Sequence, residues 1–466
     1  MSTIAHPKVD SPVLAGPIPP AKQLPFFKYL RTVRRNFIEA LHEDMYRQRI
    51  VEQRSPGSHS FIVNDPAGVR HVLLDNAANY PKARVEHRIL GPGLGKGLIL
   101  SEGETWRTHR RIMAPAFDAR TVEKYAPVMV DATEKLTRRW EGLAAGTKVE
   151  MGEAMMALTL EIIARSMFSS DSDSIAGIVG QGSDRYQQVM MVGLLEFIPG
   201  IGPVWSAYKG VRGRAIMKDF NRAFHELFMA RSKGANEGRD LLSRLMEARD
   251  EQTGNGMSER EIRDEVLTIF VAGHETTALT MMWTWYLLAI HPEHEARLHA
   301  ELAEVLGGRT PTWADVARLS YTRMVIQESM RLYPPVHTLA FREAQKDDVV
   351  CGMRVPKGSV ISIIPWVIHR HRSYWKDPER FDPERFVPEE VAKRERLAYM
   401  PFGFGPRVCI GATFAMTEAV LILATIAQRF RLRVAEGCCV EPLAMFTLRA
   451  KNGMWMEVEA RDQVRC

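Results

Sequence analysis

The chain has 466 residues, of which 45% are hydrophobic and 25% are charged, a composition typical of a globular protein with a large apolar core. Its net charge of +6 is small for this length, so nothing in it calls for a nucleic-acid partner. The five cysteines include no CxxC pair, which argues against a zinc site, and their odd number does not suggest a disulfide framework.

The first 25 residues are rich in proline, and the stretch 15–25 is expected to be extended because proline interrupts helices. No apolar run there approaches the roughly 20 residues that span a bilayer, and no cleavable leader is visible. We therefore predict a lead-in over 1–25, a single domain over 26–466, no membrane anchor, a cytoplasmic location and a monomer.

The clearest predicted helix runs from Ser258 to Ile290. Ser258 and Glu261 have the spacing of a capping box, and His291-Pro292 ends the pattern. The middle of this segment is apolar on nearly every face, which indicates a helix buried on all sides. The polar run Gly273-His274-Glu275-Thr276-Thr277 inside it is therefore unusual.

A second helix is predicted over 320–332, followed by short strands at 360–364, 430–434 and 454–458. Because strands are few and late, we expect a mainly α fold with small peripheral sheets. The glycine-rich stretch 91–97 matches no phosphate-binding motif and is interpreted as a flexible loop over a pocket.

The polar run has two possible explanations besides catalysis. A hydrogen-bonded polar patch within a helical core is one of them. The other is a zinc-protease motif H-E-x-x-H beginning at His274, but position 278 is alanine, so this option fails.

The most informative segment is Phe402-Gly403-Phe404-Gly405-Pro406-Arg407-Val408-Cys409-Ile410-Gly411, which leads directly into a helical pattern over 412–429. The two glycines permit backbone conformations that other residues avoid, and Pro406 stiffens the turn. Cys409 lies just before a helix N-terminus, where free N–H groups favour a thiolate. A lone intracellular cysteine is more often a small buried hydrophobic residue than a reactive thiolate. The surrounding sequence therefore decides between these two interpretations of Cys409.

This segment resembles the haem-binding loop of the cytochrome P-450 superfamily, F-x-x-G-x-R-x-C-x-G, at all five specified positions: Phe402, Gly405, Arg407, Cys409 and Gly411. The resemblance implies that the Cys409 sulfur binds haem iron and promotes cleavage of the O–O bond. It further implies that Arg407 pairs with a haem propionate and that Phe402 shields the sulfur.

Three further segments are similar to the family's patterns. Ala272 to Thr277 matches the distal-helix pattern, which implies that Gly273 makes room beside haem, Thr276 holds the oxygen and Glu275 heads a proton relay. Trp106 and Arg110 match W-x-x-x-R, and Arg342 falls where a further propionate partner is common.

The third of these segments is Glu328-Ser329-Met330-Arg331, similar to the family's E-x-x-R. The resemblance implies that an arginine of a Pro-Glu-Arg-Phe segment joins this pair and locks the loop before Cys409. The chain contains this tetrapeptide twice, at 378–381 and 383–386, and the spacing favours Arg385 of the second copy.

The resemblance implies a haem-thiolate monooxygenase that contains haem b and inserts one atom of dioxygen into an apolar fatty acid, terpenoid or aromatic compound. Electrons would come from a separate ferredoxin or flavodoxin with its NAD(P)H-dependent reductase, docked at Arg107, Arg110 and Arg111. The pocket is expected to include segments 82–100 and 186–220 and the side chains of Phe270, Ala272, Val336 and Phe446. A peroxide-using haem-thiolate enzyme and a non-enzymatic haem sensor are the alternatives.

Overall fold

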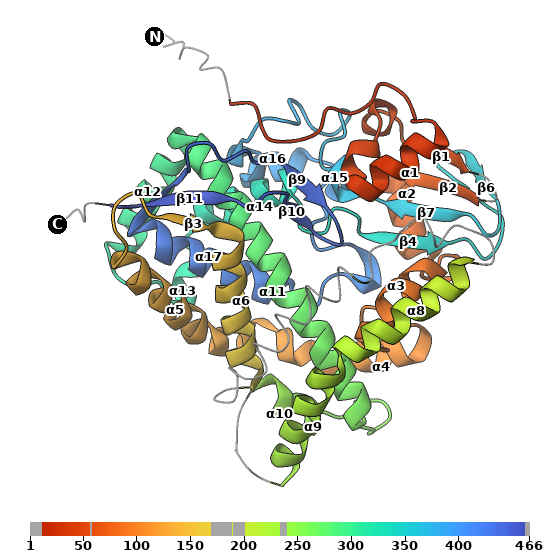
Figure 1. The fold of residues 1–466 in the computed structure, drawn as a ribbon, viewed down its shortest axis with the longest axis horizontal. Coiled ribbons are helices and arrows are strands. Elements are labelled where there is room, and N and C mark those ends of the chain that lie inside the picture. Colours follow the sequence, from red (N-terminus) through yellow and green to blue (C-terminus); the bar gives the residue numbers. More distant parts are fainter. Residues whose placement is uncertain (1–11, 56–57, 169–188, 190–200, 234–239, 462–466) are drawn as a thin grey trace.

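The computed structural model describes residues 12–55, 58–168, 189, 201–233 and 240–461. Helices dominate it, as the sequence predicts (Figure 1). They are α1 (Phe26–Arg35), α2 (Pro66–Arg70), α3 (Arg84–Leu94), α4 (Gly103–Met113), α5 (Ala119–Glu141), α6 (Met151–Phe168), α8 (Ile201–Ile216), α9 (Lys218–Ser232), α10 (Leu241–Glu247), α11 (Glu259–Ile290), α12 (Pro292–Leu306), α13 (Trp313–Val316), α14 (Ser320–Leu332), α15 (Pro365–Ile368), α16 (Pro388–Lys393) and α17 (Ala412–Ala427). The strands are β1 (Ile50–Ser55), β2 (Ser58–Val63), β3 (Lys148–Glu150), β4 (Ala340–Glu343), β5 (Asp348–Val350), β6 (Met353–Val355), β7 (Val360–Ile363), β8 (Phe430–Val434), β9 (Pro442–Ala444), β10 (Leu448–Ala450) and β11 (Trp455–Ala460).

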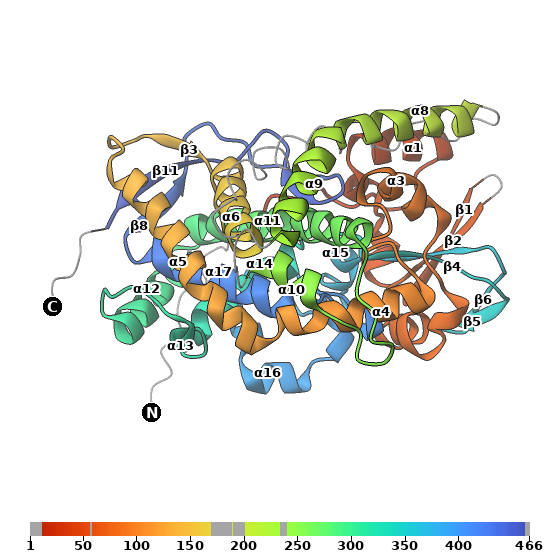
Figure 2. The ribbon, with the colours of Figure 1, turned by 90° about the horizontal axis from the view of Figure 1, so that it is seen from below.

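Helix α11 is the central element, and its 32 residues cross the middle of the molecule in both views (Figures 1 and 2). The predicted capping box is confirmed, because the Ser258 side chain accepts from the Glu261 N–H and the Glu261 carboxylate accepts from Ser258. Its middle turns pack against α6, α14 and α17. Trp283, fully buried, stacks on Tyr333 with ring centroids 4.2 Å apart. Helix α11 therefore lies at the centre of the apolar core.

Two main sheets lie at opposite ends of the molecule (Figure 1). One has the order β1-β2-β7-β4, with β2 parallel to β7, and the other has the order β3-β11-β8. The predicted terminal pair is confirmed by the register Met456↔Val434. The prediction that strands occur only late is wrong, because the hairpin β1–β2 forms near the N-terminus. Strand β2 of this hairpin pairs with β7, about three hundred residues later in the chain. A local sequence pattern does not reveal such a pairing.

The glycine-rich stretch 91–97 is not the free loop that the sequence predicts. Its first part ends α3, and Gly95 and Gly97 lie directly against α11, where an added methyl group would collide with Asp264 or Thr268. The N–H groups of Lys96 and Leu98 donate to the carboxylates of Asp264 and Glu265, both at 2.8 Å. The glycines are therefore needed for close packing of this segment on the central helix.

The extended lead-in touches the core at Ala15, whose N–H donates to Tyr286 at 3.1 Å and whose carbonyl accepts from Tyr333 at 2.7 Å. Residues 1–11 lie outside the described part of the chain, so the division at residue 25 remains a prediction. Among the helices that the structure describes, none combines the length and the apolar character needed to cross a bilayer.

Candidate active site

The loop before α17 is shaped by its glycines. Gly403 and Gly405 both have a φ of 76°, a region that side chains with a Cβ rarely occupy. A methyl group at Gly405 would also lie 2.7 Å from the Leu73 carbonyl oxygen. The Cys409 N–H donates to the Phe402 carbonyl at 2.8 Å and closes the loop. The predicted role of the two glycines in the turn is thus confirmed.

Cys409 is an exposed residue, but its thiol is closely surrounded by protein. Burial raises its pKa, and the Gly411 N–H and the positive charge of Arg110 act in the opposite direction. Both observations fit a sulfur at the edge of an interior hollow. A stable thiolate here needs an additional positive partner, and an iron ion would supply it.

Four basic side chains gather beside this loop, and we call them the cation cluster: Lys82, Arg110, Arg342 and Arg407. Burial and then the charge of Arg342 lower the pKa of Arg407 to about 10. Burial, together with the charges of Arg342 and Arg407, lowers the pKa of Lys82 to about 8, although Glu86 acts in the opposite direction. Like charges held together in a poorly hydrated place indicate that an anionic partner belongs there.

The carboxylates near the cation cluster neutralise only part of its charge. Glu86 contacts Lys82 at 3.2 Å and Arg342 at 3.9 Å. One guanidinium nitrogen of Arg342, Nη1, is buried without a hydrogen-bond partner among the described residues. The carboxylates of a haem would meet this need, so the residues present fit that group.

The W-x-x-x-R motif on α4 also lies at the cation cluster. The guanidinium of Arg407 lies over the Trp106 ring, 4.5 Å from its centroid, and donates to the Ser101 carbonyl at 2.8 Å. Arg110 donates to the Val408 carbonyl at 2.8 Å. The structure therefore brings together Trp106 and the predicted arginines of three separate segments, with Trp106 supporting Arg407 through a cation–π contact.

Removing one arginine of the cation cluster tests its role. We expect Arg407→Ala to release haem roughly ten to a hundred times faster than the unchanged protein, because a charge-assisted hydrogen bond is worth about 1.5–3 kcal/mol. The measurement is the rate of haem transfer to an excess of a haem-scavenging protein. Arg396→Ala, which removes an exposed arginine that precedes this loop in the chain, is the control. Equal release rates for the two variants would contradict this role.

On α11, Ala272 and Thr276 share one helical face. Ala272 is exposed although it lies in the middle of a buried helix, so this face borders open space. The Thr276 hydroxyl donates to the Ala272 carbonyl at 2.7 Å. A threonine hydroxyl within a helix commonly donates to the carbonyl four residues earlier in this way.

Gly273 lies on a different side of the helix from Ala272. A methyl group there would meet Ile163 of α6 at 3.5 Å, an ordinary packing distance. The expectation that this glycine makes room on the haem side is therefore not supported, since consecutive helical positions are 100° apart.

Glu275 points to the β9–β10 hairpin. Its Oε1 accepts from the Thr447 hydroxyl at 2.6 Å and from Arg449 Nε and Nη2 at 2.9 and 2.6 Å. Neither partner is apparent from the sequence, because 172 and 174 residues separate them from Glu275. The structure thus pairs the predicted relay acid with an arginine.

The predicted pocket residues divide into two groups. Ala272 is exposed and Val336 and Phe446 are half-buried, which fits side chains that border a cavity. Phe270 has no exposed surface and stacks on Phe168, with ring centroids 5.3 Å apart. Its assignment to the pocket is wrong, because two positions along a helix turn a side chain to nearly the opposite face. Most of the segment 186–220 that precedes residue 201 lies outside the described residues.

The E-x-x-R pair is fully buried. Arg331 Nε and Nη2 donate to the two carboxylate oxygens of Glu328, both at 2.7 Å, and Arg385 Nε lies 3.4 Å from Glu328 Oε1. The third partner thus comes from the second Pro-Glu-Arg-Phe copy. The first copy takes part through its backbone, since the carbonyls of Pro378 and Arg380 accept from Arg331.

A short relay joins this triad to the cysteine loop. Arg331 donates to the His369 carbonyl at 2.9 Å, and the His369 ring nitrogen accepts from the Met400 N–H at 3.0 Å. Burial lowers the pKa of His369 to about 3, which keeps the ring neutral and able to accept. Met400 in turn accepts from Gly403 in the cysteine loop.

Sequence reasoning did not single out Lys82, Arg449 or Glu418. Glu418 is the only charged residue within α17, and this was an available signal, because a carboxylate in an otherwise apolar helix is rarely buried without a reason. Lys82 carried no signal, since its place in the cation cluster depends on a long-range bridge to Arg342.

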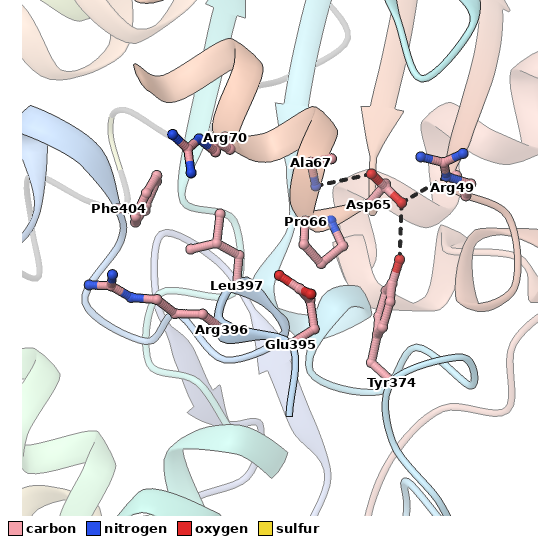
Figure 3. A pocket seen from close by; sticks show the side chains of 10 residues that line it. All are labelled: Arg49, Asp65, Pro66, Ala67, Arg70, Tyr374, Glu395, Arg396, Leu397 and Phe404. Carbon is pink, nitrogen blue, oxygen red and sulfur yellow. Dashed lines mark hydrogen bonds and ion pairs between the residues drawn. The ribbon is translucent and has the colours of Figure 1, made fainter. Parts of the chain in front are cut away.

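Two pockets flank the cysteine loop. One, of about 670 Å³, is lined by Phe402, Val408 and Met416 among others. The other, of about 340 Å³, includes Phe404 (Figure 3). Asp65 in this pocket is already paired, since it accepts from Arg49 at 2.7 Å and from Tyr374 at 3.1 Å. We assign no ligand to this second pocket.

Comparison with known proteins agrees with the geometry. A family model described as cytochrome P450 matches residues 18–455. Cyclooctatin synthase of Streptomyces melanosporofaciens is 37% identical, with 86% of each chain covered, and cyclooctat-9-en-7-ol 5-monooxygenase of that organism is 36% identical, with 83% of each covered. Leukotriene-B4 omega-hydroxylase 3 of Mus musculus is 33% identical over 84% of this chain and 78% of its own.

Among solved structures, the haem domain of cytochrome P450DA superposes with a TM-score of 0.83 at 26% identity, covering 97% of this chain and 99% of that one. The residues matched by the family model, 18–455, include every segment of the candidate site. The chain therefore belongs to the cytochrome P450 family and is a haem-dependent monooxygenase that uses dioxygen.

Proposed function

We propose that this monooxygenase holds haem b through Cys409 and hydroxylates an apolar terpenoid. The observation that carries the cofactor assignment is the exposed residue Cys409 beside a partly buried cation cluster whose charge is only partly neutralised. A sulfur with cations beside it suits a planar group with a metal at its centre and carboxylates at its edge.

In this proposal each residue has a limited task. When bound, haem supplies the activation of dioxygen and the insertion of one oxygen atom. Cys409 provides the thiolate, Arg342 and Arg407 hold the carboxylates, and Thr276 orients the oxygen by its hydroxyl group. Glu275, which is paired with Arg449, passes protons from the side of the β9–β10 hairpin toward the oxygen.

The substrate class is inferred from the pocket and the relatives. Ala272, Val336 and Phe446 offer apolar surface with no charged group among these three, which suits a hydrocarbon skeleton. Two of the relatives are named for cyclooctatin and cyclooctat-9-en-7-ol, and the third for leukotriene B4. We rank a cyclic terpenoid alcohol first and a fatty-acid chain second.

Electrons reach family members from a redox partner, and we propose a ferredoxin or flavodoxin with its NAD(P)H-dependent reductase. Of the three arginines expected to dock it, Arg111 is paired with Asp250 at 2.7 Å and Arg110 is turned toward the cysteine loop. Arg107 pairs with Glu104 at 3.2 Å, but both side chains are largely exposed, so it is the remaining candidate on α4. We further propose that the protein acts as a monomer in the cytoplasm.

A spectral-shift screen tests the substrate class. We expect cyclic terpenoid alcohols to displace iron-bound water and shift the haem absorption at micromolar concentrations, fatty acids to do so more weakly, and compounds of equal size without an apolar skeleton to have no effect. Ala272→Phe should abolish the terpenoid response by filling the accessible face of α11. A response confined to fatty acids or aromatic compounds would overturn the ranking.

Turnover separates this function from its two alternatives. Purified protein supplied with NADPH, ferredoxin and reductase should convert the compound found in the screen. Product formed only with hydrogen peroxide would favour a peroxide-using enzyme. A spectral response without any product under either condition would favour a haem sensor.

A further inference from the structure

A polar pair lies in the segment that leads from α14 into β4. Thr338 is half-buried, and its hydroxyl oxygen lies 3.0 Å from Nδ1 of His337, which is buried. On the other side of the ring, Nε2 lies 2.9 Å from the carbonyl oxygen of Met445, in the turn of the β9–β10 hairpin. The hydroxyl, the imidazole ring and the hairpin are thus joined by one short chain of hydrogen bonds.

Thr338 lies between this hairpin and the cysteine loop. The residue before it, His337, contacts the hairpin turn, which also carries Phe446. The residue after it, Leu339, lies against the cysteine loop, because a methyl group added at Gly403 would be 3.2 Å from the leucine side chain. The accessible part of Thr338 therefore faces the space that these two elements border, where we place the substrate.

The Met445 carbonyl determines which ring nitrogen of His337 carries the proton. A carbonyl oxygen can only accept a hydrogen bond, so Nε2 must donate and Nδ1 is left as an acceptor. Burial lowers the pKa of His337 to about 4, so the ring is neutral near pH 7 and Nδ1 holds no proton. The Thr338 hydroxyl must therefore donate its hydrogen bond to Nδ1.

A hydroxyl group that already donates its proton can only accept further hydrogen bonds. The oxygen of Thr338 keeps its lone pairs, and no other group among the described residues donates to it. Such an oxygen suits a ligand group that donates a hydrogen bond. It disfavours a ketone or an ether, because these groups have lone pairs alone and would stay unpaired in apolar surroundings.

We propose that Thr338 is a specificity-determining residue that accepts a hydrogen bond from the hydroxyl group of an alcohol substrate. His337 is a positioning residue, since it fixes the direction of that hydrogen bond through Thr338. The inference rests on the proposed function, because it assigns a partner to the hydroxyl group of the terpenoid alcohol ranked first there. An alcohol held in this way also has fewer orientations before the haem than its hydrocarbon skeleton alone would have.

Matched compounds test the direction of the hydrogen bond. The probes share one bicyclic skeleton and are the alcohol nootkatol, its methyl ether and the ketone nootkatone. Their dissociation constants are measured from the shift of haem absorption in the holoprotein. The unchanged protein should bind the alcohol about tenfold more tightly than the ether or the ketone. Thr338→Val should remove this preference by weakening the alcohol alone, and Thr338→Ser should restore it.

Thr147→Val is the matched control for these variants. Thr147 is also half-buried and its hydroxyl also donates to a nearby acceptor, the Ala144 carbonyl, but it precedes β3 in another part of the fold. This variant should keep the preference of the unchanged protein for the alcohol.

A further variant tests the role of His337. His337→Phe keeps an aromatic ring beside Phe37, whose centroid lies 5.7 Å from the imidazole, but it removes the Nδ1 acceptor. The Thr338 proton can then be donated to a carbonyl oxygen, so the ketone should gain affinity and the preference for alcohol over ketone should fall to about twofold. A purely structural role of His337 would weaken the binding of all three compounds alike, and this result would overturn its positioning role.

The outcomes separate this inference from the function on which it rests. If the unchanged protein binds the three compounds equally well, or if Thr338→Val keeps the preference for the alcohol, the inference is wrong and the terpenoid function stands. If none of the three shifts the haem absorption of the unchanged protein, the terpenoid assignment is wrong, and the role of Thr338 is rejected with it.

Discussion

Replacing Cys409 with serine is expected to abolish monooxygenase activity, with a loss of at least about a thousandfold. A serine hydroxyl is a poor iron ligand and cannot donate electron density as a thiolate does. The reduced, carbon monoxide-treated protein should then lose the strongly red-shifted absorption that marks sulfur ligation. The loop itself should persist, because the Cys409 N–H would still donate to the Phe402 carbonyl.

Cys439→Ser is the control for this experiment. Cys439 is exposed and lies outside the site, so its replacement should leave the spectrum and the activity unchanged. The assignment of the iron ligand is wrong if the serine variant at 409 keeps the red-shifted absorption.

The largest effect on stability is expected for Arg331→Ala, a loss of about 3–5 kcal/mol in the free energy of unfolding. Both members of the Glu328–Arg331 pair are fully buried, so the variant leaves a carboxylate without its main partner in the core. It also removes the donors to His369, Pro378 and Arg380. The midpoint of urea unfolding, followed by tryptophan fluorescence, measures the loss of stability. The same midpoint followed by haem absorbance shows whether the cysteine loop is also destabilised.

Arg385→Ala is the matched variant for the same triad. Its contact with Glu328 is longer, 3.4 Å, and its side chain is partly accessible, so we expect a smaller loss of about 1 kcal/mol. If Arg331→Ala were no worse than Arg385→Ala, the buried pair would not be what supports the loop.

Much of the site can be predicted from short stretches of sequence. The glycines, arginine and cysteine of 402–411 are within ten residues of one another, so their spacing already implies a tight loop ahead of a helix N-terminus. The capping box at Ser258 and the apolar run behind it likewise predict α11 almost to the residue. These features follow from neighbours along the chain, and local backbone preferences are sufficient to specify them.

Other features arise only when distant segments meet. Three such features each join residues more than a hundred positions apart. They are the hydrogen bonds to Glu275, the close packing of Gly95 and Gly97 on α11, and the contact between Glu418 and Thr277. The side on which a helical residue lies was also misjudged at Phe270, because an all-apolar helix has no amphipathic pattern to indicate which face meets the cavity. Packing of the folded chain chooses these contacts, since it depends on shape and burial that no local spacing encodes.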